Sequence, residues 1–237
     1  MAVFSVVVID LNCDMGELED AAHEAALLDY ITSANIACGG HAGDENTMER
    51  TARLALARNV RIGAHPGYPD RANFGRLEIA MIPAEIERIV REQIDRLEAV
   101  VRRFGGEIAH VKPHGALYNV AARDGETARA IGRAVVQWNP RATLFGLAGS
   151  PALGLWRDMG LPVAAEAFAD RRYEPDGSLR SRKFPDALIT DPQEAAAQAL
   201  RFAREGKVQT ICVHGDTPGA VEILRACREA LRDMLEF

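Results

Sequence analysis

The chain has 237 residues, of which 48% are hydrophobic and 26% are charged, and its formal net charge is −6. This composition predicts a folded α/β protein with a sizeable core, and the acidic balance gives no support for a nucleic-acid or membrane-surface partner. No apolar run approaches the roughly 20 residues that cross a bilayer, so we expect a soluble, cytoplasmic protein. The widely spaced cysteines, which we expect to be reduced core thiols, are Cys13, Cys38, Cys212 and Cys227.

Strand-like and helix-like segments alternate along the chain, which is typical of βα units around a parallel sheet. The first strand is predicted from the apolar run 6–9, because strands covered on both faces are continuously hydrophobic. Six further strands are predicted at residues 31–37, 60–64, 108–111, 143–147, 163–165 and 208–213. Helices are predicted at residues 18–30, 45–58, 83–104, 126–138, 151–159 and 192–205, with a last helix starting at Thr217.

Seven βα units in this length predict one barrel-like α/β domain that spans residues 1–237. No linker-like or low-complexity stretch divides the chain. An open doubly wound sheet is the alternative architecture. Neither G-x-G-x-x-G nor G-x-x-x-x-G-K-[ST] occurs, so the usual phosphate-binding loops are absent.

A polar cluster, Asp10-Leu11-Asn12-Cys13-Asp14-Met15-Gly16-Glu17, follows the first predicted strand. In parallel α/β folds the loops after the strands carry the chemistry, and the rest of each unit is scaffold. We therefore predict that Asp14 and Glu17 line an active site.

Four of the six histidines, His41, His65, His114 and His214, fall just past a predicted strand. If the strands are parallel, these side chains meet at one end of the barrel with the residues of the polar cluster. Lys112 and Glu166 also follow strands and are expected at the same end. The other two histidines lie in a predicted helix and within a predicted strand, where a structural role is expected.

Carboxylates beside imidazoles can serve two chemistries. One is general acid–base catalysis, in which neighbouring groups have pKa values that are pushed apart. The other is binding of a divalent metal that polarises a carbonyl and activates water. No fixed spacing such as H-E-x-x-H selects the metal, so the sequence leaves both open.

A loop after the sixth predicted strand concentrates positive charge in an otherwise acidic protein. Its basic residues are Arg171, Arg172, Arg180, Arg182 and Lys183. They can pair with acidic neighbours as a solvated loop, or a guanidinium can capture a carboxylate or phosphate.

The motifs at these strand ends preserve one order along nearly the whole chain. They are Asp10 to Glu17, Ala34 to Asp44, Gly63 to Arg76, Val111 to Asn119, Glu166 to Arg182 and Val213 to Gly219. Together they resemble the LamB/YcsF family. Two positions depart from the family pattern: Leu18, where a small polar residue is common, and Leu77, where a second arginine is usual.

The resemblance implies a distorted (β/α) barrel of about seven strands, similar to the glycoside hydrolase/deacetylase group. It implies opening of 5-oxo-L-proline to L-glutamate while ATP, with Mg²⁺, is hydrolysed. It also implies two partner subunits, B and C of a 5-oxoprolinase, which would provide part of the nucleotide site that this chain lacks.

On this basis the catalytic set is expected at the barrel mouth. Asp14 or Glu17 is the expected base on the attacking water, and His65 or His114 is expected to protonate the ring nitrogen. Lys112 would offset charge on the oxygen or phosphate. His41 belongs to the same set. The residues expected to bind substrate are Asn12, Asn35, Glu166, Arg171, Arg172 and His214.

Two other functions are compatible with the same residues. A metal-dependent amidohydrolase or deacetylase would act alone and lose activity to a chelator. A non-catalytic carrier would bind 5-oxoproline but leave turnover intact when the histidines are replaced. The sequence does not decide whether the protein itself holds a divalent metal.

Overall fold

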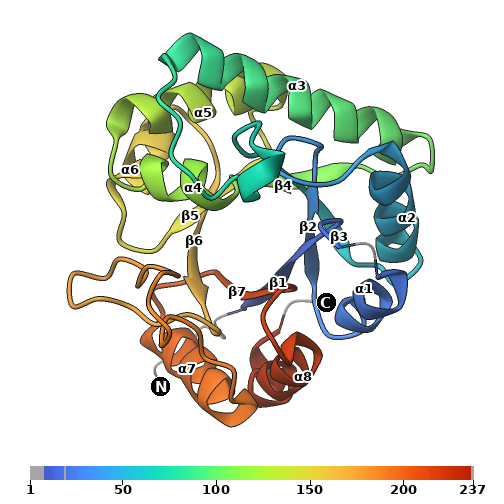
Figure 1. Ribbon diagram of the computed structural model, residues 1–237, viewed down its shortest axis with the longest axis vertical. Helices are drawn as coiled ribbons and strands as arrows, with labels where there is room; N and C mark the ends of the chain where they lie inside the picture. Colours follow the sequence, from blue (N-terminus) through green and yellow to red (C-terminus); the bar gives the residue numbers. More distant parts are fainter. Residues whose placement is uncertain (1–7, 19, 236–237) are drawn as a thin grey trace, which may run out of the picture.

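A closed barrel of seven parallel strands organises the molecule (Figure 1). The computed structural model describes residues 8–18 and 20–235. The strands pair in chain order, and the last strand pairs with the first to close the barrel. The strands are β1 Asp10–Met15, β2 Ser33–Ala37, β3 Arg61–His65, β4 Ile108–Val111, β5 Thr143–Leu147, β6 Val163–Phe168 and β7 Thr210–His214. The predicted barrel is confirmed, and the open sheet is excluded.

The helices lie outside the barrel and surround it in the view of Figure 1. They are α1 Ala21–Leu28, α2 Glu45–Leu56, α3 Pro83–Arg102, α4 Gly115–Ala121, α5 Gly125–Trp138, α6 Pro151–Asp158, α7 Pro192–Glu205 and α8 Ala220–Ala230. Two short 3₁₀ helices are η1 Arg71–Asn73 and η2 Arg232–Met234. None of the helices in the described part of the chain has both the length and the apolar character needed to span a membrane.

Local sequence signals fix the ends of several helices. Asp191 caps α7, where its Oδ1 accepts the N–H of Glu194 at 2.7 Å, and Gly206 ends this helix in the left-handed region. Asp44 caps α2 by accepting the N–H of Thr47 at 2.8 Å. The helices that these caps fix bury their apolar faces against the barrel.

The first strand differs from its prediction. It begins at Asp10, so the polar cluster forms the strand itself instead of following it, and residues 6–7 of the predicted run 6–9 lie outside the described residues. Side chains alternate along a barrel strand, which turns Asn12 and Asp14 to the interior while Leu11 and Cys13 join the apolar core under the helices. The polar residues of this buried strand therefore line the inside of the barrel.

Two further segments differ from their predictions. Glu166 lies within β6, which runs on to Phe168, so its side chain also enters the barrel from a strand. The segment after His114, for which no helix is predicted, forms the short helix α4, which starts at Gly115 with a φ of 53°. A β-carbon at Gly115 would lie 2.7 Å from the carbonyl oxygen of Gly75, so glycine is required there.

The amino-terminal end of the barrel interior is closed by a satisfied polar layer, which we call the Asp10 layer. Asp10 is buried, and its carboxylate accepts hydrogen bonds at 2.5 to 2.8 Å. The donors come from the starts of neighbouring strands and are Thr32, Ser33, Arg61 and Thr210. This layer is structural, because every oxygen of the carboxylate already has partners.

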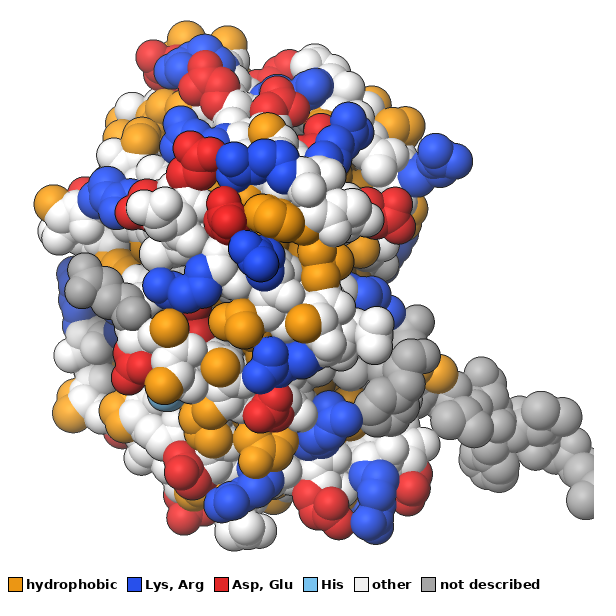
Figure 2. Space-filling view, turned by 90° about the vertical axis from the view of Figure 1, so that its right-hand side faces the viewer, with side chains coloured by type: hydrophobic (Ala, Val, Ile, Leu, Met, Phe, Trp, Pro, Cys, Tyr) orange, Lys and Arg blue, Asp and Glu red, His pale blue; other side chains and the backbone are white. Residues whose placement is uncertain are grey.

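The face of the molecule drawn in Figure 2 carries basic and acidic side chains in alternation, with hydrophobic side chains in small groups. No large patch of a single sign gathers on this face. Strong concentration of titratable groups is instead found inside the barrel, at the carboxyl ends of the strands.

Candidate functional site

The turn after β1 carries Glu17 over the barrel mouth. Gly16 adopts a φ of 70°, and its N–H donates to Glu24 Oε1 at 2.5 Å. Glu24 is buried and is held in turn by the hydroxyl of Thr51 at 3.0 Å and by Arg50 at 3.1 Å. The carboxylate of Glu24 thus anchors the turn that positions Glu17.

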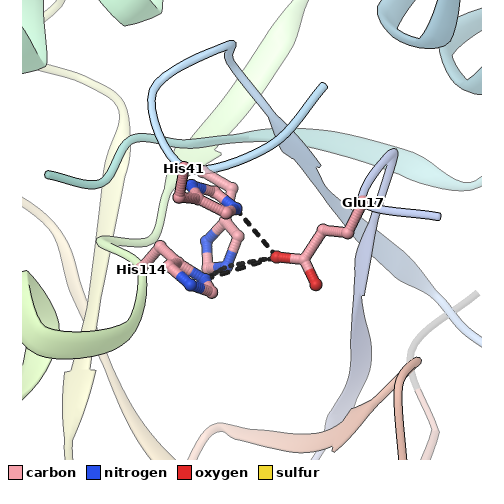
Figure 3. A group of neighbouring side chains, drawn as sticks. Glu17, His41 and His114 are labelled. Carbon is pink, nitrogen blue, oxygen red and sulfur yellow. Dashed lines mark hydrogen bonds and ion pairs between the residues drawn. The ribbon is translucent and has the colours of Figure 1, made fainter. Parts of the chain in front are cut away.

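Three imidazoles converge on the Glu17 carboxylate. His41 lies in the loop after β2, His65 ends β3, and His114 is the N-cap of α4. The rings of His41 and His114 stack at 3.6 Å and both face Glu17 (Figure 3). Glu17 Oε1 lies 2.8 Å from Nε2 of His41, 3.3 Å from Nδ1 of His114 and 3.8 Å from Nε2 of His65. All three imidazoles are buried.

The loop after β3 packs directly over these rings. A β-carbon at Gly67 would lie 2.9 Å from Nδ1 of His41, and one at Gly75 would lie 2.7 Å from His41 Cβ. Both glycines are therefore required for the close approach. Gln93 of α3 fixes the loop, since its Nε2 donates to the Gly67 carbonyl at 2.8 Å and its Oε1 accepts the Gly67 N–H at 3.1 Å.

A buried lysine links the other carboxylates of the site. Lys112 Nζ lies 2.8 Å from Asp14 Oδ1 and 3.0 Å from Glu166 Oε1. It also donates to Asn12 Oδ1 at 3.2 Å and to Cys212 Sγ at 3.1 Å. The lysine side chain is 2% exposed, so its charge is balanced by protein carboxylates and not by water.

Two asparagines orient this group. Asn12 donates through Nδ2 to Glu166 Oε1 at 3.0 Å. Asn35 donates through Nδ2 to Asp14 Oδ1 at 2.9 Å and accepts from His110 Nε2 at 2.7 Å through Oδ1. Asn12 and Asn35 thus hold the carboxylates in place, and His110 has the structural position expected from its place in a strand.

Charge pairing sets the ionisation of the Asp14 group. Burial raises the pKa of Asp14, but His65 and Lys112 outweigh it and hold that pKa well below its usual range. Burial lowers the pKa of Lys112, but Asp14 outweighs it, so that pKa is raised. The lysine is therefore a cation and Asp14 a carboxylate at neutral pH.

The Glu17 side of the site is dominated by burial. Burial raises the pKa of Glu17, and it lowers the pKa values of His41 and His114 well below their usual range. A neighbouring imidazole lowers each histidine pKa further. Both rings are thus neutral at pH 7 and present lone pairs.

Asp170 fixes the position of the His214 imidazole in the site. Its Nδ1 lies 3.0 Å from Asp170 Oδ2, and its own backbone N–H donates to the same oxygen at 3.0 Å. Thr217 donates its hydroxyl to Asp170 at 2.5 Å. With Nδ1 held by a carboxylate, His214 has one orientation and leaves Nε2 for a ligand or a proton.

The arginines of the loop after β6 have separate environments. Arg171 is buried, donates to the Arg180 carbonyl at 2.7 Å, and has an Nε without a partner among the described residues. Arg172 pairs with Glu194 on α7 at 2.8 Å, on the solvent side. Arg182 and Arg76 both pair with Asp216, which joins the loops that follow β6, β3 and β7.

Sequence reasoning missed several residues at the site. Tyr118 is buried in α4, and neither its hydroxyl nor Glu166 Oε2 has a hydrogen-bond partner among the described residues. Burial, and then Glu166, raise the pKa of Tyr118 well above its usual range, which places the two groups near each other. Glu24 and Asp170 anchor site residues, but only their spatial neighbours reveal these roles.

Two groups of side chains have a geometry that could hold a metal ion. In the first, one atom each from Glu17, His41, His65 and His114 lie within 4.8 Å of one another. In the second, Asp14, Cys212 and His214 meet the same criterion. Three imidazoles and one carboxylate are a donor set that suits zinc-like cations.

Comparison with known proteins decides the family. The LamB/YcsF profile matches residues 9–235. The chain belongs to the LamB/YcsF family. It is 51% identical to the A subunit of 5-oxoprolinase from Chloroflexus aggregans, over 94% of each chain. It is 47% identical to the A subunit of 5-oxoprolinase from Shouchella clausii, over 96% of this chain and 94% of that relative.

Solved structures agree with this membership in the LamB/YcsF family. The lactam utilization protein from Thermus thermophilus superposes with a TM-score of 0.86 at 42% identity, covering 95% of this chain and 96% of that one. A CE4 family pseudoenzyme superposes with a TM-score of 0.53 at 11% identity, covering 97% of this chain and 64% of that one. The second likeness concerns the fold alone.

Proposed function

We propose that this chain is the A subunit of a cytoplasmic, ATP-dependent 5-oxoprolinase, which converts 5-oxo-L-proline to L-glutamate with hydrolysis of ATP. Relatives at 47–51% identity bear that name and match nearly the full length. The observation that carries the proposal is the buried Lys112 between Asp14 and Glu166, beside the imidazoles at the carboxyl end of the barrel. This arrangement presents a cation and several carboxylates to a small polar substrate.

The chemistry explains why ATP is needed. A lactam is a poor electrophile because amide resonance stabilises its ground state. Transfer of the γ-phosphoryl group of ATP to the lactam oxygen releases ADP and removes that resonance. Water then attacks the carbon that bears this phosphorylated oxygen. The ring C–N bond breaks, the nitrogen takes up a proton, and the product is an acyl phosphate. A second water hydrolyses the acyl phosphate and releases phosphate.

The site offers groups for the proton transfers. Asp14 or Glu17 takes the proton of the attacking water, and His65 or His114 protonates the ring nitrogen. His65 Nε2 lies 3.3 Å from Asp14 Oδ2, close enough for these groups to act on neighbouring atoms of one substrate. The Lys112 cation offsets negative charge on the lactam oxygen or the phosphoryl group.

Polar atoms without partners support the choice of substrate contacts. Glu166 Oε2 can accept the lactam N–H, and the hydroxyl of Tyr118 can contact the same ring. Arg171, whose Nε is buried and unpartnered within the described structure, is proposed to hold the substrate carboxylate. His214 is a further proposed substrate ligand, whereas the ion pair of Arg172 with Glu194 makes Arg172 the least favoured of the proposed ligands.

We propose that subunits B and C provide part of the ATP·Mg²⁺ site. The sequence has neither common phosphate-binding loop. Arg76 and Arg182 share a single carboxylate partner, Asp216, which already takes up part of their capacity to bind an anion. A complete nucleotide site therefore needs additional groups.

Replacement of Asp14 tests the proposal. In the complex of all three subunits, Asp14→Asn is expected to lower ATP-coupled formation of glutamate by about 10²–10⁴-fold, because a positioned base is lost. Asp158→Asn, at an exposed site on α6, is the matched control and should leave turnover unchanged. Near-normal turnover of a folded Asp14→Asn complex would show that the assignment is wrong.

Metal-dependent hydrolysis by this chain alone is the second candidate, because the Glu17 group has the donors of a metal site. Such an enzyme would cleave amides without partners or nucleotide and would lose activity to a chelator. Assay of the isolated chain with 5-oxoproline, with and without ATP and Mg²⁺, separates the two. A carrier would bind 5-oxoproline in calorimetry, yet the complex would keep full turnover after replacement of His65.

A further inference from the structure

We propose that Glu17, His41, His65 and His114 form a binding site for one divalent transition-metal cation of the zinc class. The four ligand atoms are Glu17 Oε1, His41 Nε2, His65 Nε2 and His114 Nδ1. They come from four different loops or strand ends, and they lie within 4.8 Å of one another. The chemical role of this metal site rests on the proposed function, but metal binding is inferred from the geometry of the four side chains and does not depend on that function.

The hydrogen bonds of two rings fix which nitrogens face the site. His65 Nδ1 lies 2.7 Å from the Lys112 carbonyl oxygen, and His114 Nε2 lies 2.9 Å from the Phe74 carbonyl oxygen. A carbonyl only accepts, so both of these nitrogens carry hydrogens. Imidazoles that bind metals are held in this way by their far nitrogen. The near nitrogens, His65 Nε2 and His114 Nδ1, are then the two that face the cluster and can bind a cation.

Those two nitrogens face each other at 2.9 Å. Without a proton or a metal ion between them, their two lone pairs would repel each other. Glu17 Oε1 adds a third acceptor, 3.3 Å from the same His114 nitrogen. His41 Nε2 lies 2.8 Å from Glu17 Oε1 and can donate to it, but the facing nitrogens of His65 and His114 still need a cation between them, either a proton or a metal ion.

A proton satisfies only part of this geometry. Placed on His65 Nε2, it would bridge to His114 Nδ1, with Asp14 Oδ2 at 3.3 Å supporting the charge. Glu17 Oε1 would still face a His114 lone pair. One metal ion satisfies all four donors at once, and imidazole with carboxylate is the ligand set of zinc and its neighbours and not of magnesium.

The surroundings of the cluster favour a small bound ion. Gly67 and Gly75 let the loop after β3 pack directly against His41 and enclose the cluster. When bound, such a cation supplies polarisation of a carbonyl or activation of water. The acid role proposed above for His65 or His114 then applies only to the metal-free chain, and in the metal-bound chain His214, which Asp170 holds, takes that role.

Metal binding is measured on the isolated chain, without partners or nucleotide. The chain is stripped with a chelator and titrated with ZnCl₂ in a calorimeter, and CoCl₂ is added separately to read its visible absorption. We expect one equivalent of metal, a cobalt spectrum of a low-coordinate nitrogen and oxygen site, and a higher melting temperature with zinc. His114→Gln and Glu17→Gln should each weaken binding by roughly 10–100-fold or more.

His23→Gln is the matched control, because His23 is an imidazole outside the cluster that contacts the Gly215 carbonyl. It should bind metal like the wild type. If His114→Gln does not fold, the Glu17→Gln variant decides. Less than one equivalent in the wild type, or equal affinity in Glu17→Gln, would overturn the inference. The metal titration tests the metal site, and ATP-coupled turnover of the metal-free complex is a separate measurement that tests the proposed function. Failure of one proposal can therefore be distinguished from failure of the other.

Discussion

Replacement of Lys112 by methionine tests whether the barrel mouth is held together by a buried charge. The side chains of Lys112, Asp14 and Glu166 are 2%, 4% and 0% exposed. Methionine has a similar volume, so the change leaves two buried carboxylates without their shared cation. Breaking a buried ion pair by removal of one partner costs about 3–5 kcal/mol. In a chain of this size, the melting temperature should fall by roughly 6–20 °C.

Urea unfolding of the isolated chain, followed by circular dichroism, measures this loss. Addition of Glu166→Gln to Lys112→Met removes one of the unpaired charges and should recover about 1–3 kcal/mol of the free energy of unfolding. Lys207→Met, at an exposed position, is the control and should change stability by less than about 0.5 kcal/mol. A Lys112→Met protein as stable as the wild type, or a double variant less stable than the single one, would refute the reasoning.

Two further predictions concern the interior around His110. Gly63→Ala should destabilise the fold by about 1–3 kcal/mol in urea unfolding, because a β-carbon there would lie 2.0 Å from His110 Nε2; an unchanged midpoint would contradict this. Burial lowers the pKa of His110 from 6.5 to about 3. As the pH falls below 6.5, the His110 imidazole therefore binds a proton in the unfolded chain but stays neutral in the folded chain. Stability should therefore drop by up to about 1.4 kcal/mol per pH unit between pH 6.5 and 4, and the drop should be shallower in His110→Gln; equal slopes would count against the buried neutral ring.

The barrel was predictable because its units repeat. The predicted strands are short and mostly apolar, most helices have a clear periodicity or cap, and the predicted bounds of β4 and β5 agree with the structure. The polar residues at strand ends could then be assigned to one end of the molecule, and Asp14, His65, Lys112 and His114 are indeed within contact distance of one another. Parallel topology alone brings residues from distant segments together.

The contents of the barrel were harder to predict. An apolar run precedes Asp10 and favours a strand there, although the alternation from Asp10 to Met15 is what an interior-facing polar strand looks like. Glu24 lies in a helix with ordinary helical composition, and nothing local indicates that it accepts the Gly16 N–H. The pairing of Arg172 with Glu194 likewise depends on how α7 packs, which the pattern of charges does not contain.

The two ends of the barrel interior differ in how their polar atoms are satisfied, and this difference supports our proposal that ligand binds at the carboxyl end. The Asp10 layer has a donor for each carboxylate oxygen. At the other end, Glu166 Oε2 and the Tyr118 hydroxyl have no hydrogen-bond partner among the described residues, and His65 Nε2 and His114 Nδ1 face each other at 2.9 Å. Each buried polar atom left unpaired costs about 1–3 kcal/mol, so a fold retains several together only where a bound substrate or ion supplies the missing partners. At the carboxyl end of the barrel, the unpaired groups that would bind a ligand therefore lower the stability of the unliganded fold.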